Sequence, residues 1–218
     1  SFEYKPVPRK LHGKPVPRIP ELSGELQGRL SFPHVCVGSP FKFQAHGRSG
    51  RYLSELYPHL AEHVDLFVCE TMGACFEARA AADAARTSGK PVWVSFTLQG
   101  GEGAGLIDGT SFSEACAVVD ADAFLLNCCP PERIAHALPL LREATNLTIG
   151  AYANAFHQMP VGWRGRDGSP LPEARTDMGV DPYTRAVMQW VDMGAEVVGG
   201  CCEIGPGHIA RIRQALDA

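Results

Sequence analysis

The sequence predicts an α/β fold made of repeated β–α units around a parallel sheet. From about residue 31, short β-rich apolar runs alternate with helical patterns, and six such units follow one another at intervals of roughly 30 residues. The apolar runs are mostly unbroken, which is typical of strands buried on both faces of a parallel sheet. With 218 residues, the chain can form one domain with a sizeable core. These features fit either a (β/α) barrel or an open sheet.

The predicted strands and helices alternate along the chain. We expect strands at 34–39, 64–70, 91–98, 123–129, 147–156 and 195–201. We expect helices at 49–62, 76–88, 111–120, 131–144, 181–193 and 206–217. Residues 1–30 differ, because the motif KPVPR occurs there twice and spaced prolines favour polyproline II over helix. We therefore predict an extended, Pro-rich arm over 1–30 and the α/β unit over 31–218.

Composition and charge exclude several classes of protein. Hydrophobic residues make up 45% and charged residues 20%, which is a globular rather than a disordered composition. The net charge is −4 and no basic, aromatic-rich stretch is present, so we expect no nucleic-acid partner. No apolar run approaches the roughly 20 residues of a membrane span, and no signal peptide opens the sequence. We expect a cytoplasmic protein whose eight cysteines stay reduced.

Polar and thiol side chains stand where the predicted strands end, and in both architectures this edge binds the ligand. They include two vicinal cysteine pairs, Cys128–Cys129 and Cys201–Cys202. Three thiolates from separate strand ends can hold one Zn²⁺ and leave its fourth position open, and soft ligands of this kind select zinc or Cu(I) over magnesium or calcium. The spacing alone also allows core cysteines or a dithiol redox pair.

Five segments resemble, in order, the motifs of the homocysteine S-methyltransferase family. They are VDLFVCETM from residue 64, PVWVSFTL from residue 91, LLNCCPPERI from residue 125, GAYANAF from residue 150 and GGCCEIGPGHIARI from residue 199. The resemblance runs from about residue 34 to the C-terminus. It implies a TIM-type (β/α)₈ barrel. It also implies transfer of a methyl group from a small cationic donor, with S-methylmethionine or S-adenosylmethionine favoured, to L-homocysteine, forming methionine.

The same resemblance implies the residues of the site. The zinc ligands would be Cys128, Cys201 and Cys202, and Glu70 would hold the ammonium group of homocysteine. We also place Thr71, Asn127 and Asn154 in the substrate pocket. Aromatic faces attract cationic donors, so the donor side is expected to include Tyr152, Phe156, His157 and Trp163.

The chain departs from the family pattern in two respects. Six strands are counted where a full barrel has eight, and the first two β/α units are absent. We therefore expect a partial barrel that is either a fragment or is completed by another copy or a second chain. Glu203 stands where many relatives have glycine. An inactive, metal-stabilised or partner-binding remnant of the family is the alternative to an active enzyme, beside the redox protein named above.

Overall fold

The structure is a computed structural model that describes residues 3–4, 35–38, 60–100, 103–158 and 173–218, with the first two of these ranges described by their backbone alone. The strands are β1 (Glu3–Tyr4), β2 (Val35–Gly38), β3 (Phe67–Met72), β4 (Val92–Phe96), β5 (Ala123–Asn127), β6 (Thr148–Tyr152) and β7 (Val197–Val198). The helices are α2 (Cys75–Arg86), α3 (Phe112–Val118), α4 (Pro131–Ala144), α5 (Val180–Asp192) and α6 (Pro206–Leu216). All six predicted strands are confirmed, and the predicted helix 49–62 lies almost wholly outside the described residues.

The sheet confirms the predicted α/β class. Its order is β1-β7-β6-β5-β4-β3-β2, so β2 to β7 lie side by side in sequence order, and every pair among them is parallel. Each parallel crossover that the structure describes from β3 onward contains a helix, as the β–α rhythm of the sequence predicts. In the described part of the chain no pairing joins β2 to β1, so the sheet is an open row of seven strands.

The count of six strands was one too low. Glu3–Tyr4, inside the predicted arm, pairs antiparallel with β7 through Tyr4 opposite Val197. A two-residue edge strand of this kind depends on backbone hydrogen bonds and carries no hydrophobic period, so the sequence pattern does not reveal it. The rest of the predicted arm lies outside the described residues, and its separate status stays a prediction.

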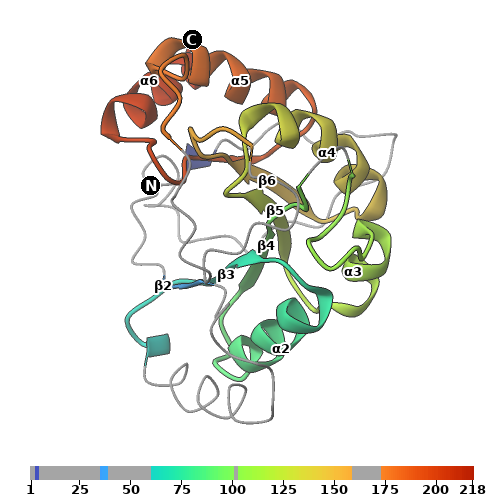
Figure 1. Ribbon diagram of the computed structural model, residues 1–218. Helices are drawn as coiled ribbons and strands as arrows, with labels where there is room; N and C mark the ends of the chain where they lie inside the picture. Colours follow the sequence, from blue (N-terminus) through green and yellow to red (C-terminus); the bar gives the residue numbers. More distant parts are fainter. Residues whose placement is uncertain (1–2, 5–34, 39–59, 101–102, 159–172) are drawn as a thin grey trace.

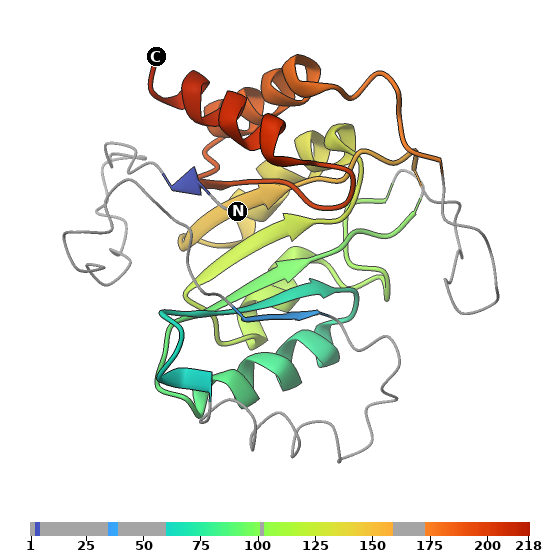
Figure 2. The same ribbon diagram turned by 90° about the vertical axis from the view of Figure 1, so that its left-hand side faces the viewer.

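The helices cover one face of the sheet. Figure 1 shows α2 to α6 along the outer side of a curved sheet, in an arc that follows the order of the strands, and Figure 2 shows the strands stacked between α2 and the α5–α6 pair. The main core lies between these two layers. The other face carries a smaller apolar cluster, made of Leu66, Val68, Trp93, Ala123, Leu125, Tyr152 and Val197. Burial on both faces explains why the strands are apolar without interruption.

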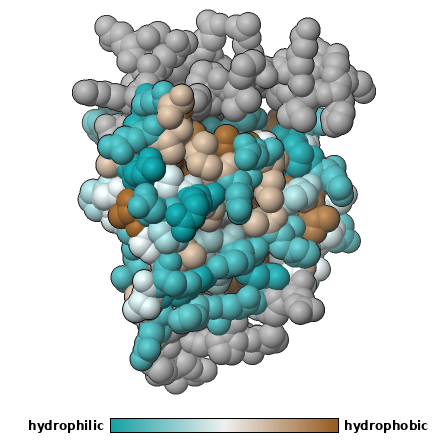
Figure 3. Space-filling model, turned by 90° about the horizontal axis from the view of Figure 1, so that it is seen from above, coloured by the Kyte–Doolittle hydropathy of each residue, from teal (hydrophilic) through white to brown (hydrophobic). Residues whose placement is uncertain are grey.

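The surface over α5 and α6 is mostly hydrophilic. Figure 3 shows only small, separate hydrophobic areas on the face of the molecule seen from above. Among the described residues, no helix has the length and apolar character needed to cross a bilayer, and α4 has 14 residues against the roughly 20 that a span requires.

Candidate metal and substrate site

Two cysteine pairs meet at the carboxyl edge of the sheet because the chain continuing from β6 lies between them. Cys201 donates its backbone N–H to the carbonyl of Ala153 at 2.8 Å, and Ala155 donates to the carbonyl of Cys202 at 3.0 Å. On its other side the same segment bonds the first pair, since Asn154 donates its backbone N–H to the carbonyl of Cys129 at 3.1 Å. The segment thus holds both pairs in a fixed register.

A left-handed turn separates the two cysteines of the first pair. Cys128 has φ 55°, a conformation that residues other than glycine rarely adopt and that is concentrated at functional sites. Its backbone N–H is bonded to the carbonyl of Tyr152 at 3.3 Å. Cys129 packs into the core beneath the helices, whereas the half-buried Cys128 lies with its sulfur 3.9 Å from Nδ2 of Asn154.

Three sulfurs form the candidate metal centre. The Sγ atoms of Cys128, Cys201 and Cys202 all lie within 4.8 Å of one another, and those of Cys201 and Cys202 are 3.8 Å apart. Tetrahedral zinc with Zn–S bonds of about 2.3 Å places its sulfurs about 3.8 Å from one another. The cluster therefore fits a zinc ion with three protein ligands. In the part of the chain that the structure describes, no other group of three such ligands is present.

The three thiols share their protons unequally. Hydrogen bonds from Cys128 and Cys201 lower the pKa of Cys202 to about 3. Hydrogen bonds with Cys128 and Cys202, together with burial, raise the pKa of Cys201. The pKa of Cys128 is raised to about 12, because a hydrogen bond from Cys201 that lowers it is outweighed by the bond to Cys202 and by burial. Hydrogen bonding within the cluster thus favours the thiolate form at Cys202 over the other two cysteines.

We expect Cys202 to react first when the metal-free protein meets iodoacetamide. Its thiolate is already formed above about pH 5, so the alkylation rate should be flat from about pH 5 to pH 8. The control is Cys116, whose pKa is raised to about 12 by burial and which should stay unmodified. Peptide mass mapping after timed labelling measures both rates, and a Cys202 rate that rises tenfold per pH unit contradicts the assignment.

Glu70 lies at the same edge, at the end of β3. The hydroxyl of Tyr152 donates to Oε2 of Glu70 at 3.2 Å, from the small apolar cluster on the inner face of the sheet. Tyr152 is 2% exposed, and this hydrogen bond places its hydroxyl against the carboxylate that is predicted to bind the ammonium group. Its predicted role on the donor side stays a prediction that this contact does not support.

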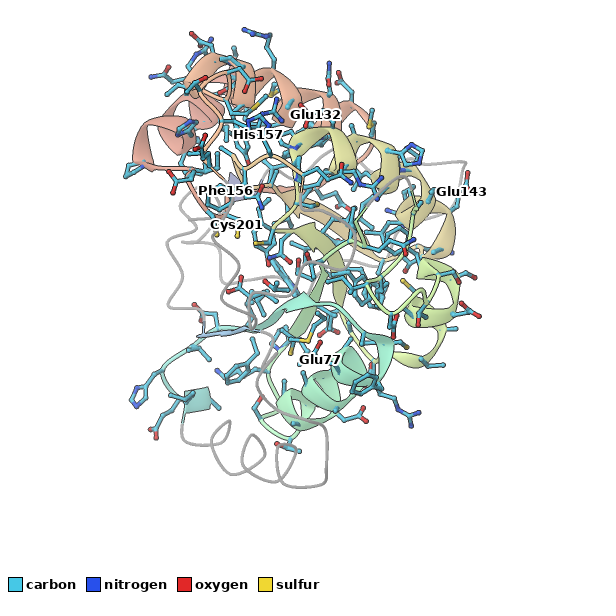
Figure 4. The ribbon with its side chains drawn as sticks, viewed as in Figure 1. Glu77, Glu132, Glu143, Phe156, His157 and Cys201 are labelled. Atoms are coloured by element: carbon cyan, nitrogen blue, oxygen red, sulfur yellow. The ribbon has the colours of Figure 1, made fainter. Side chains whose placement is uncertain are left out.

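The remaining predicted residues are placed as follows. Asn154 is 2% exposed, and its Oδ1 accepts the backbone N–H of Phe156 at 3.2 Å. Phe156 is half-buried and His157 is exposed, and Figure 4 shows Phe156 near Cys201 and His157 farther from it, on the side of Glu132. Trp163 lies outside the described residues. Thr71 and Asn127 are joined by two hydrogen bonds, from the backbone N–H of Thr71 to Oδ1 of Asn127 and from Nδ2 of Asn127 to Oγ1 of Thr71.

Two residues that sequence reasoning did not select also shape the site. The buried hydroxyl of Tyr183, on α5, lies 3.1 Å from the carbonyl of Ala153 and 2.8 Å from that of Gly199, just before Asn154 and Cys201. Nδ1 of His208 accepts the backbone N–H of Gly205 at 3.2 Å and closes the turn after Cys202. Gly205 and Pro206 indicate where α6 begins, whereas nothing in the sequence marks the contacts of His208 or Tyr183.

Glu203 follows the metal cluster in a strained conformation. It has φ 67°, which glycine adopts freely and other residues adopt at a cost. We expect Glu203→Gly to raise the free energy of unfolding by about 0.5–1 kcal/mol in urea denaturation. Glu203→Gln removes only the charge of an exposed side chain and should leave stability unchanged, so an equal gain from both variants would assign the effect to charge instead.

A parallel α/β sheet with three converging sulfurs at its carboxyl edge marks a protein with a candidate site for a soft metal ion. The family model described as homocysteine S-methyltransferase matches residues 43–216. Homocysteine S-methyltransferase 4 of Zea mays is 30% identical over 162 residues, which are 70% of this chain and 44% of that protein. This chain belongs to the homocysteine S-methyltransferase family.

Solved structures agree on the fold. The apo form of the homocysteine methyltransferase MmuM from Escherichia coli matches with a TM-score of 0.58 and 23% identity, over 83% of this chain and 61% of that one. Its metallated form matches with a TM-score of 0.54 and 24% identity, over 74% and 52%. The chain spans about half the length of the curated relatives it matches.

Proposed function

We propose that this protein transfers a methyl group from a small cationic donor, S-methylmethionine or S-adenosylmethionine, to L-homocysteine and forms methionine, in a zinc-dependent reaction. The single observation that carries the proposal is the cluster of Cys128, Cys201 and Cys202, whose sulfurs lie within 4.8 Å of one another at the ligand-binding edge. Membership of the family supports the acceptor and the reaction class.

Zinc held by these three thiolates would supply an open fourth position that keeps an acceptor sulfur deprotonated at neutral pH. The protein's own residues bind and orient the reactants. Glu70, fixed by the hydroxyl of Tyr152, offers its carboxylate to the ammonium group of the acceptor. Asn154 directs its amide at Cys128 and keeps that sulfur in place. Holding the acceptor in this way removes much of the entropic part of the barrier.

The reaction is a direct displacement. The thiol proton of homocysteine passes to solvent, and the sulfur lone pair forms a new bond to the donor's methyl carbon. The bond between that carbon and the donor's sulfonium sulfur breaks at the same time, so the donor leaves as a neutral thioether. We assign Phe156, half-buried beside the cluster, to the donor side, where its ring face attracts the sulfonium group.

We also propose that the row of parallel strands is part of a TIM-type (β/α)₈ barrel and that the protein acts in the cytoplasm. The order of β2 to β7, each beside its sequence neighbour, is the order that a barrel requires. Reduced cysteines suit the cytoplasm, and the structure contains no disulfide among the cysteines it describes.

The test is methyl transfer from S-methylmethionine or S-adenosylmethionine carrying a labelled methyl group. Labelled methionine should form only with homocysteine present, and Glu70→Gln should lower kcat/KM by about tenfold or more because the ammonium loses a charged partner. Glu132→Gln is the matched control, since Glu132 is an exposed residue of α4 that pairs with Arg175. Failure to form methionine with either donor, in protein that holds zinc, would refute the proposal.

A further inference from the structure

The side chain of Asn127 is fully buried and has hydrogen-bond partners at both ends. It is 0% exposed at the end of β5. Its Oδ1 accepts the hydroxyl of Ser95 at 2.8 Å and the backbone N–H of Thr71 at 3.0 Å. Its Nδ2 donates to Oγ1 of Thr71 at 2.8 Å. Asn127 therefore hydrogen-bonds both the main chain and the side chain of Thr71.

Thr71 is held in a conformation that it would not adopt unaided. Its φ is 61°, in the left-handed region, where a β-branched residue is a genuine outlier that persists only when its surroundings enforce it. The strand is irregular at the same point, because Cys69 pairs with Val94 while Met72 pairs with Phe96, so β3 carries one extra residue. Bulges of this kind redirect a side chain next to a functional site.

Glu70 and Thr71 are the two residues inside this bulge, where they stand opposite the single residue Ser95 of β4. Its carboxylate is held from one side by Tyr152, which is the cross-strand partner of Asn127. Its backbone is fixed from the other side by the bonds of Asn127 to Thr71. Asn127 also directly precedes Cys128, itself at φ 55°. One amide thus joins the strand end that carries Glu70 to the strand end that carries the first sulfur.

We propose that Asn127 is a positioning residue that acts through Thr71 to set the place of Glu70 relative to the sulfur cluster, and that it does not touch the acceptor itself. The inference rests on the proposed function, because Glu70 is assigned there to the acceptor's ammonium group. It replaces our expectation from the sequence that Asn127 lines the substrate pocket. The fully buried and bonded amide has no atom exposed to a ligand.

The test compares two ligands that differ only in the ammonium group. Homocysteine and its analogue without the amino group, 4-mercaptobutanoate, are titrated into the zinc-loaded full chain by calorimetry. Asn127→Ala should lower the affinity for homocysteine by about tenfold or more and the affinity for 4-mercaptobutanoate by less than about threefold. Zinc content should stay at about one per chain, because Cys128 is still held by its bonds to Tyr152 and Asn154.

Two further variants keep the test decisive. Asn146→Ala is the matched control, since Asn146 is exposed in the loop between α4 and β6, and it should bind both ligands as the unmodified protein does. Thr71→Val is used if Asn127→Ala does not fold. It keeps the shape of Thr71 and removes the Oγ1 acceptor of Nδ2, and it should show the same selective loss for homocysteine.

The outcomes separate the two proposals. The positioning role is overturned if Asn127→Ala lowers the affinity for both ligands equally or lowers neither. It is also overturned if Thr71→Val shows no selective loss of homocysteine binding. Unmodified protein that binds zinc but neither thiol ligand overturns the proposed function instead. A selective loss for homocysteine alone, with zinc retained, supports the positioning role.

Discussion

Cys201→Ser is expected to abolish stable zinc binding. Cys201 belongs to the cluster, because its sulfur lies 3.8 Å from that of Cys202 and within 4.8 Å of that of Cys128. Serine keeps the shape but offers a hydroxyl, which is not ionised at neutral pH and is a poor ligand for a soft metal. The loss should reach about a hundredfold or more in zinc affinity, on the order of 3 kcal/mol. Competition with a chromophoric chelator measures it.

The control for this variant is Cys75→Ser. Cys75 is also half-buried, but it begins α2 and lies outside the cluster, so zinc affinity should stay unchanged. Cobalt(II) is a second probe, because its sulfur-to-metal charge-transfer band in the near ultraviolet reports the number of thiolates bound. The band should weaken in Cys201→Ser and keep its full intensity in Cys75→Ser. Full zinc affinity and an unchanged band in Cys201→Ser would remove the basis of the proposed metal centre.

Much of the fold was predictable because burial on both faces leaves a simple trace in the sequence. The strands from β3 to β7 coincide with unbroken apolar runs, and α4 has the predicted bounds 131–144. The Ser111–Glu114 capping box starts α3 close to the predicted residue. The edge strand β1 was missed, because backbone pairing at an edge requires no particular side chains.

The approach of the two cysteine pairs was predictable, whereas the contacts around them were not. The carboxyl ends of parallel strands share one edge, so Cys128 and Cys201 were expected to meet, and the structure brings their sulfurs together. The contact between Tyr152 and Glu70 was not predictable, because an aromatic residue near a strand end can face either reactant, and its donor-side role stays a prediction. The left-handed conformation of Thr71 was not predictable either, because the residues around this threonine give no sign of a bulge.

Gly150→Ala is expected to destabilise the protein strongly, because Gly150 of β6 leaves no room for a methyl group. A Cβ at Gly150 would stand 2.5 Å from the carbonyl oxygen of Val197 and 2.7 Å from its Cβ, and 3.0 Å from Cδ2 of Leu125. The first of these atoms belongs to the backbone of β7, which cannot rotate away as a flexible side chain can. We expect the free energy of unfolding to fall by about 2–3 kcal/mol in urea denaturation.

The same substitution at Gly207 should act in the opposite direction. Gly207 lies in the first turn of α6, where the nearest atom to an added Cβ is Cγ2 of Val180 at an ordinary 3.7 Å. Alanine favours helix over glycine, so Gly207→Ala should stabilise the protein by about 0.5 kcal/mol. Because β6 and β7 lead directly to Asn154 and Cys201, Gly150→Ala should also weaken zinc binding, and Gly207→Ala should not. A Gly150→Ala variant as stable as Gly207→Ala would show that β6 and β7 lie farther apart than this structure places them.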